Sequence, residues 1–419
     1  MKILRTFGAQ AQAAGAAISA LEQRGAVNTA KVDAVVQDIL AKIRTDGDSA
    51  VRQFASKFDG LTADQPFRVT REEMQAAWES TSEELRAAMR LAQANIRAFA
   101  EKQLPHAWSF RPSDGMEVGQ IVRPLASVGC YIPGGRYPLP STVLMTATPA
   151  QVAGVERIVL CSPKPAPETM AAAYLCGVTE FYRIGGAQAI AALAFGTPTI
   201  PAVDKIVGPG NLFVTAAKIA VSHQTGVDMP AGPTEILVAS EIGDPSGIAA
   251  DIVAQAEHDP EALAILVTSN VDLAGEVDLE VKRQSQENAV AKESLAAQGF
   301  IFITASIEEA HALTNRLAPE HLTVDAGADL RWIKNAGSVF VGHHTPQSMG
   351  DYVSGPNHVL PTGRWGRVRG GLSVFDFLKI ITVQQYTLDA LREVGPHTIA
   401  LAEAEGLIGH AESVRVRMR

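Results

Sequence analysis

The chain has 419 residues, of which 47% are hydrophobic and 19% charged, and its formal net charge at pH 7 is -9. This length suffices for about two or three domains with sizeable cores. The acidic balance argues against nucleic acid or an anionic membrane as the main partner, because both attract basic surfaces, and it is compatible with a cationic substrate.

Cysteine usage bears on the compartment. Cys130, Cys161 and Cys176 show no CxxC spacing, which argues against a disulfide framework and against a four-cysteine zinc site. We therefore expect a reducing, cytoplasmic environment. The alanine-rich stretch 1–21 superficially resembles a signal peptide, but glutamines interrupt it, so we predict an amphipathic helix there. No apolar window approaches the ~20 residues of a membrane span.

Helices dominate the N-terminal part of the chain. Apolar side chains recur there at helical spacing over residues 32–43, 49–58, 71–81 and 83–102. The character changes after Pro112, where a strand-like run over 120–131 leads into a glycine loop.

Two blocks of alternating strands and helices follow, which is typical of parallel sheets covered by helices on both faces. The first block has expected strands at 157–161, 181–184, 205–207 and 235–238, and helices at 168–176, 187–194 and 212–221. The second has expected strands at 264–268, 300–304 and 338–341, and helices at 248–257, 273–298 and 307–317. The residues from Gly371 onward predict a helical tail.

The resulting fold class is α/β, with two doubly wound parallel-sheet domains, a helical N-terminal region and a small C-terminal tail domain. The chain enters a second domain and returns to the first. The expected divisions are a helical arm over 1–24, an α/β domain made of 25–126 and 239–370, an inserted α/β domain over 127–238, and a tail over 371–419.

Glycine-rich loops stand between strands and helices of the inserted domain, at residues 131–136, 185–188 and 208–211. Such loops can expose backbone amides to a phosphate at the carboxyl edge of a parallel sheet. Glycine turns are also needed for purely structural reasons. The GxGxxG fingerprint is absent, because Phe213 stands in its third glycine position, so any nucleotide would bind atypically.

Three polar clusters could carry chemistry. Gln255 and His258 share one helix face and could hold a metal, although a solvated polar stripe has the same pattern. Glu320 and His321 follow a helix-ending proline and could move protons near neutral pH, although surface pairs also occur there. Asp351 lies in a glycine- and proline-containing loop and suits a metal or an ammonium group.

The tail contains Glu405 and His410, which alone would be more typical of a surface. His358, in the same loop as Asp351, is interpreted as satisfying loop backbone.

The motifs together resemble the histidinol dehydrogenase family, in the family's order and over nearly the whole chain. The matching runs are 129–135, 185–190, 208–211, 231–235, 255–258, 319–322, 350–360 and 405–410. Each run alone is weak evidence, whereas the set is highly specific.

The resemblance implies NAD-dependent oxidation of L-histidinol through L-histidinal to L-histidine, the last step of histidine biosynthesis. It implies one Zn2+ per subunit, held by Gln255, His258, Asp351 and His410. Implied NAD contacts are Tyr131, Gln188 and Asn211. Implied substrate contacts are Thr234, Gln255, His258, His321, Asp351, Glu405 and His410.

The same resemblance implies roles and assembly. His321 would take the alcohol proton, and Glu320 would activate a water for the aldehyde. The sheets would have incomplete nucleotide-binding topology, and a homodimer would bring Glu405 and His410 into the partner's site. Thr234 departs from the serine frequent in the family but keeps the hydroxyl.

Other functions remain open on the residues. A related zinc and NAD enzyme could act on another small polyol, such as a sulfonated propanediol, but Glu405 favours an amino alcohol. A zinc hydrolase would not need the glycine loops. A non-catalytic interaction protein would not need an intact pair of Glu320 and His321.

Overall fold

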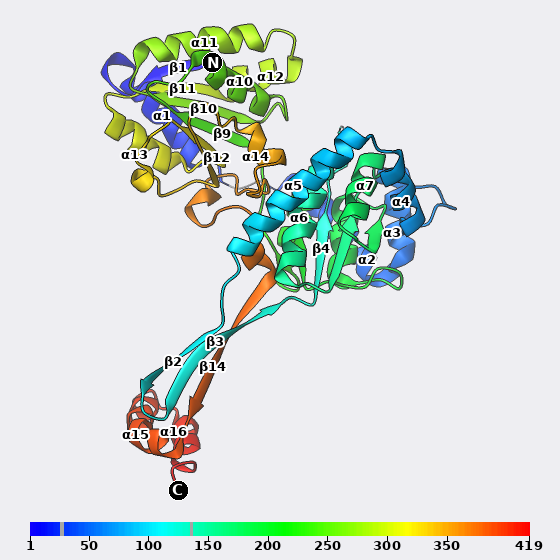
Figure 1. The fold of residues 1–419 in the computed structure, drawn as a ribbon, viewed down its shortest axis with the longest axis vertical. Helices are drawn as coiled ribbons and strands as arrows, with labels where there is room; N and C mark the ends of the chain where they lie inside the picture. Colours follow the sequence, from blue (N-terminus) through cyan, green and yellow to red (C-terminus); the bar gives the residue numbers. More distant parts are fainter. Residues whose placement is uncertain (26–28, 135–136) are drawn as a thin grey trace.

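The computed structural model describes residues 1–25, 29–134 and 137–419, so Gly135 and Arg136 of the first glycine loop lie outside the described residues. The described chain forms two parallel sheets with helices around them and a separate antiparallel arm (Figure 1). Two doubly wound parallel-sheet units were predicted, and this part of the fold class is confirmed.

A five-stranded parallel sheet forms the first unit, in the order β6-β5-β4-β7-β8. Its strands are β4 (Ser127–Tyr131), β5 (Arg157–Cys161), β6 (Glu180–Tyr182), β7 (Lys205–Val207) and β8 (Gly226–Val227). Its connecting helices are α6 (Pro140–Ala153), α7 (Pro167–Leu175), α8 (Gly186–Phe195) and α9 (Leu212–Val221). Counted along the chain the order is 3-2-1-4-5, the dinucleotide-binding order without its sixth strand.

The N-terminal helices pack on this sheet. They are α2 (Asp33–Asp46), α3 (Asp48–Phe54), the π-helix η2 (Ala55–Asp59), α4 (Arg71–Ser80) and α5 (Glu83–Lys102). One buried cluster joins Val36 and Ile43 to Ile190 and Ile206. The division expected from the sequence places residues 25–126 in one domain with residues 239–370, whereas helices α2 to α5 pack on the five-stranded sheet. An apolar helix face can pack on either sheet, and chain order does not decide between them.

A six-stranded parallel sheet forms the second unit, in the order β1-β11-β10-β9-β12-β13. Its strands are β1 (Lys2–Arg5), β9 (Glu235–Ala239), β10 (Leu263–Thr268), β11 (Gly299–Ile303), β12 (His321–Val324) and β13 (Ser338–Val341). From β9 onward the chain repeats the 3-2-1-4-5 order.

Helices cover both faces of the six-stranded sheet. The helices α10 (Pro245–Ala256), α11 (Val271–Gln284) and α12 (Ala289–Gln298) share a core with one face. On the other face lie α1 (Ala11–Glu22) and α13 (Ile307–Leu317). The short elements are η1 (Gly8–Gln10), η3 (Leu330–Trp332), α14 (Ser348–Tyr352), η4 (Trp365–Arg367) and η5 (Val374–Phe377).

Two sequence-based expectations differ here. The N-terminal stretch is not wholly helical, because β1 pairs in parallel with β11 before α1 begins at Ala11. The expected helix over 273–298 is two helices, since the Asn288 side chain accepts a hydrogen bond from Ala291 N and starts α12 anew.

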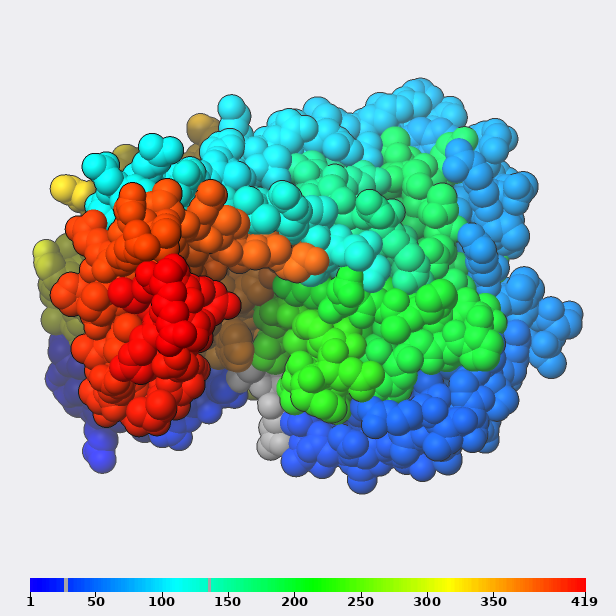
Figure 2. All heavy atoms as spheres, turned by 90° about the horizontal axis from the view of Figure 1, so that it is seen from below, coloured from blue at the N-terminus to red at the C-terminus, as the bar shows by residue number. Residues whose placement is uncertain are grey.

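The antiparallel arm projects from the two sheet-containing parts and carries the C-terminal helices at its far end (Figure 1). It consists of β2 (Trp108–Ser113), β3 (Met116–Pro124), β14 (Leu378–Tyr386), α15 (Leu388–Ala404) and α16 (Ile408–Arg415). From below, the tail (red) stands in front of the part that contains the six-stranded sheet (Figure 2).

Two elements expected from the sequence differ from the structure in the arm. The strand-like run over 120–131 is divided between β3 of the arm and β4 of the five-stranded sheet. The tail is not only helical, because β14 pairs along its whole length with β3. Pairing with so distant a segment leaves no local signal. Ile380, Ile381 and Val383 on β14 stay exposed.

No helix in the described part of the chain is long and apolar enough to cross a bilayer. The three cysteines are buried free thiols.

Candidate active site

The Glu320 carboxylate joins two neighbouring strands at the amino edge of the six-stranded sheet. Because β9 and β12 pair in parallel, with His321 opposite Ile236, the residues just before the two strands meet. The Oε2 atom of Glu320 accepts hydrogen bonds from Thr234 Oγ1 at 2.7 Å and from Glu235 N at 2.8 Å. This buried carboxylate therefore has a fixed orientation.

His321 opens β12 and is also buried. Its Nδ1 lies 3.0 Å from the backbone oxygen of Glu235, and because a carbonyl only accepts, Nδ1 carries a proton. The Nε2 atom is buried without a hydrogen-bond partner and lies 3.8 Å from Asp351 Oδ1. Nε2 is thus the ring atom free to exchange a proton with a ligand.

The pKa values of His321 and Asp351 depend on the neighbouring charges. Burial opposes protonation of His321, yet the carboxylates of Glu320 and Asp351 raise its pKa to about 10. Burial opposes ionisation of Asp351 as well, but His321 holds the pKa of that carboxyl below its usual range. The pair is therefore an imidazolium and a carboxylate, and a positive charge that engages Asp351 would favour the neutral ring that a proton acceptor needs.

Gln255 lies on α10 with its side chain buried. Its Nε2 donates to Thr234 Oγ1, while its Oε1 is buried without a hydrogen-bond partner. The helix ends at Ala256, so His258 lies on the turn that follows rather than on the helix face, with Nδ1 3.3 Å from Gln255 O.

Gln347 orients Asp351, and the sequence analysis did not single it out. Its buried Nε2 donates to Asp351 Oδ2 at 3.0 Å, and its backbone N donates to Asp251 at 3.3 Å. The available sequence signal is its position four residues before Asp351, directly before α14. His358 ties the same loop to α6, with Nδ1 2.9 Å from Asp351 O and Nε2 3.3 Å from Thr142 Oγ1.

The side chains of Gln255, His258 and Asp351 fit a bound cation in part. A buried amide oxygen without a hydrogen-bond partner is destabilising unless a ligand satisfies it, and Gln255 Oε1 is such an atom. His258 also acts electrostatically on Asp351. Among the described residues no three His, Cys, Asp or Glu side chains form a metal cluster.

The two candidate residues of the tail are far from the others within one chain. Glu405 follows α15 and His410 lies on α16, both exposed, at the far end of the arm (Figure 1). The chain by itself therefore does not bring them to Gln255, His258 and Asp351.

The expected cofactor residues lie at the carboxyl edge of the five-stranded sheet. The buried Tyr131 hydroxyl accepts from Gly186 N at 3.0 Å. Gln188 Nε2 donates at 3.0 Å to Asp59 Oδ2, which also accepts from Gly185 N at 2.9 Å. Burial raises the pKa of Asp59. No sequence signal linked this aspartate, at the end of η2, to the glycine loop.

The third glycine loop packs against the first strand. Gly208 has a φ of +109°, and a Cβ there would lie 2.2 Å from Tyr131 O, so only glycine fits. Lys218 Nζ donates to Gly208 O at 2.9 Å. Asn211 begins α9, with Oδ1 accepting from the amides of Phe213 and Val214. Tyr131, Gln188 and Asn211 are thus gathered around adjoining loops.

The two units with 3-2-1-4-5 sheets define a two-domain α/β protein. An acetylating aldehyde dehydrogenase from Geobacillus thermoglucosidasius has this fold, with a TM-score of 0.51 and 16% identity over 90% of this chain and 95% of that one. At this identity the likeness concerns the fold alone.

The family follows from closer matches. The model described as "Histidinol dehydrogenase" matches residues 22–418. A histidinol dehydrogenase from Methanothermobacter thermautotrophicus is 47% identical, covering 96% of this chain and 97% of the relative. A solved histidinol dehydrogenase from Elizabethkingia anophelis has a TM-score of 0.93 and 34% identity, covering 100% of this chain and 98% of that one.

The chain therefore belongs to the histidinol dehydrogenase family and is an NAD-dependent oxidoreductase. The family resemblance stated from the motifs is confirmed, and the alternative functions are not favoured.

Substitution of Thr234 tests whether its hydroxyl bridges Gln255 and Glu320. Thr234→Val keeps the shape but leaves Gln255 Nε2 and one acceptor position of Glu320 without a partner. We expect it to lower the free energy of unfolding by about 1–3 kcal/mol, and Thr234→Ser, which keeps the hydroxyl, to lower it by less. Urea unfolding of both variants measures this, and equal losses would contradict the bridge.

The partly buried carboxyl of Asp251 should make the stability of the folded protein depend on pH. Burial raises its pKa to about 6, against a backbone hydrogen bond from Gln347 that lowers it. The folded form thus binds the proton more tightly than the unfolded chain, with a pKa of about 3.9. Its contribution to stability is present at low pH and is lost as pH rises between about 4 and 6.

Asp251→Asn should remove that loss, by at most about 3 kcal/mol and by less after solvent screening. Unfolding midpoints from pH 4 to pH 8 measure the difference, with the exposed Asp46→Asn as control. If the curves of Asp251→Asn and the unmodified protein run parallel, the assignment is wrong.

Proposed function

We propose that this site oxidises L-histidinol through L-histidinal to L-histidine, with reduction of two NAD, as the last step of histidine biosynthesis. The observation that carries the proposal is the buried couple of Glu320 and His321, which lies beside Asp351 and is linked through the Thr234 hydroxyl to Gln255. The family membership supports the substrate and the reaction.

The positive charge of the substrate matches the carboxylates of the site. Histidinol carries an ammonium group and an imidazole, and Asp351 and Glu405 can receive the cationic end. Thr234, Gln255, His258 and His410 supply the remaining polar contacts. Orientation of the alcohol by several such contacts can contribute on the order of 7 kcal/mol to catalysis.

In the first oxidation, His321 accepts the proton of the alcohol. Its Nδ1 proton is held by the Glu235 carbonyl, so Nε2 is the atom that accepts the alcohol proton as the hydride leaves the carbon. The neighbouring Glu320 stabilises the imidazolium that forms.

The aldehyde step needs a water nucleophile. Two donors hold Glu320 Oε2, which leaves Oε1 as an acceptor for a water proton. Glu320 passes the water proton to the aldehyde oxygen as the hydrate forms. His321 must release to solvent the proton it took from the alcohol, after which its Nε2 accepts a hydroxyl proton of the hydrate in the second oxidation. None of the three buried cysteines is required.

Two groups would complete the site. NAD would be held at Tyr131, Gln188 and Asn211 and would supply the hydride acceptor for both oxidations. One Zn2+ per subunit would be held by Gln255, His258 and Asp351 together with His410 of the partner subunit, and would supply a positive charge that orients the substrate. The orphaned oxygen of Gln255 and the carboxylate of Asp351 support this ligand set.

We further propose a homodimer with shared active sites. Exposed apolar side chains on the arm and tail, among them Ile380, Ile381 and Ile408, support such an interface. Glu405 and His410 of the partner subunit would then complete each site. The biosynthetic reaction and the free thiols are consistent with the cytoplasm.

Following NADH formation tests the function. The metal-replete protein should reduce two NAD for each L-histidinol, and chelation should abolish turnover until Zn2+ is returned. Turnover only with a sulfonated propanediol, or activity unchanged after metal removal, would overturn the substrate or the metal respectively.

Glu320→Gln separates the two oxidations. The amide cannot accept the proton of water, so turnover from added L-histidinal should fall by at least about a hundredfold. Turnover from L-histidinol to the aldehyde should fall much less. Single-turnover NADH formation with each substrate measures the two rates, and equal slowing would remove this role from Glu320.

Hybrid dimers test the shared site. His321→Ala and His410→Ala proteins should each be inactive alone. In a mixed dimer, one of the two sites combines an intact His321 with an intact His410 and should regain activity. Unfolding and refolding the two variants together, followed by the NADH assay, measures this. Absence of recovery, with dimers formed, would count against the arrangement.

A further inference from the structure

The six-stranded sheet has a second crevice at its carboxyl edge, at the opposite ends of β9 and β12 from Glu320 and His321. After β9 the chain turns to α10 on one face, whereas after β12 it turns through η3 toward the face covered by α13. Neighbouring strands whose connections diverge leave a crevice, and α/β proteins commonly bind ligands there. The candidate active site lies at the other edge and makes no use of it.

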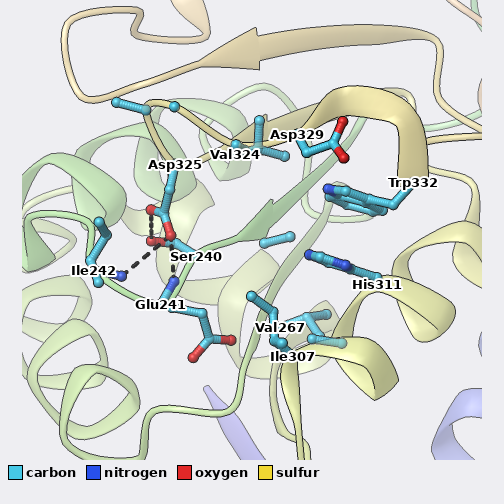
Figure 3. Close-up of a pocket in the computed structure, with 15 residues that line it drawn as sticks. Ser240, Glu241, Ile242, Val267, Ile307, His311, Val324, Asp325, Asp329 and Trp332 are labelled. Carbon is cyan, nitrogen blue, oxygen red and sulfur yellow. Dashed lines mark hydrogen bonds between the residues drawn. The ribbon is translucent and has the colours of Figure 1, made fainter.

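A cavity of about 340 Å3 occupies this crevice (Figure 3), within the usual range of small-molecule sites. Its floor is apolar and includes Val267 and Ile307. One wall consists of His311 stacked on Trp332, with ring centroids 3.9 Å apart and planes 5° apart. Glu241 and Asp325 lie on the opposite side (Figure 3).

The carboxylates are held in place. Asp325 accepts from Ser240 Oγ at 2.5 Å, from Glu241 N at 2.7 Å and from Ile242 N at 3.3 Å. Glu241 accepts from Ser269 N at 2.8 Å, from Ser269 Oγ at 2.7 Å and from Thr268 Oγ1 at 3.5 Å. A carboxylate has about four acceptor positions, so each keeps about one for a ligand.

The charge of the cavity is one-sided. Glu241, Asp325 and Asp329 line it, and the described lining contains no lysine or arginine. Arg331, outside the lining, pairs with Asp329, so Glu241 and Asp325 carry the unpaired charge. No described cationic side chain forms an ion pair with Glu241 or Asp325. Burial lowers the pKa of His311, against Glu308 and Glu241, so its ring is neutral near pH 7. Such a surface repels phosphate and attracts a cation.

We propose that this cavity binds a small aromatic cation, a flat ring that carries an ammonium group. The ring lies over the apolar floor beside Trp332, and the ammonium group faces Glu241 and Asp325. Aromatic side chains and fixed carboxylates together recognise this class, because the first take up the ring and the second the charge. The site is separate from the candidate active site and does not depend on its substrate.

The test uses the full-length protein and 2-phenylethylamine, which is cationic at pH 7 and lacks an imidazole. Calorimetry should give saturable binding at one site per chain. The matched anion 3-phenylpropionate should not bind. Glu241→Gln should weaken binding at least about tenfold by removing one charge partner. Ile307→Trp, at a partly exposed position of the floor, should abolish binding by filling the cavity.

Controls separate this site from the other one and from misfolding. Glu276→Gln, an exposed position on α11, and His321→Ala should both leave binding unchanged. If Ile307→Trp does not fold by circular dichroism, Ala326→Trp fills the cavity from its exposed side. Overturning results are no saturable binding at millimolar probe, equal binding of 3-phenylpropionate, undiminished binding in the filled variant, or loss of binding in His321→Ala.

Discussion

Parallel pairing of β9 with β12 is the constraint on which the candidate active site depends. It sets Thr234 and Glu235 beside Glu320 and His321 at one edge of the sheet. One residue of slippage would turn every side chain of β12 to the other face. The backbone of β9 contributes twice, because its first amide orients Glu320 and its first carbonyl fixes the tautomer of His321.

Residues that contact the candidate site residues fix the orientation and the charge of those side chains. Gln347 holds Asp351, and Asp351 together with Glu320 raises the pKa of His321. In the other unit, Asp59 holds Gly185 and the first turn of α8, which contains Gln188. The candidate catalytic residues thus lie at the amino edge of the six-stranded sheet, and the candidate cofactor residues lie at the carboxyl edge of the five-stranded sheet.

The sequence predicted the elements with local periodicity well, among them α2, α5, α9 and β10, and the motifs identified the family. It could not predict β14, whose partner lies far away in the chain, or the sheet on which the N-terminal helices pack. Gln347 and Asp59 escaped notice because their importance lies in what they contact. Whether Glu405 and His410 complete a site depends on a second subunit, which spacing alone does not describe.

The edge strand β1 has a consequence for biogenesis. Its partner β11 is translated only after most of the chain has left the ribosome, so residues 2–5 remain without a sheet until then. The strands and most covering helices of the five-stranded sheet, within residues 33–227, emerge earlier, although Val374 and Phe377 complete its core later. Long-range closure is slow relative to local assembly, so the nascent chain should assemble most of the unit with the five-stranded sheet before the six-stranded sheet closes.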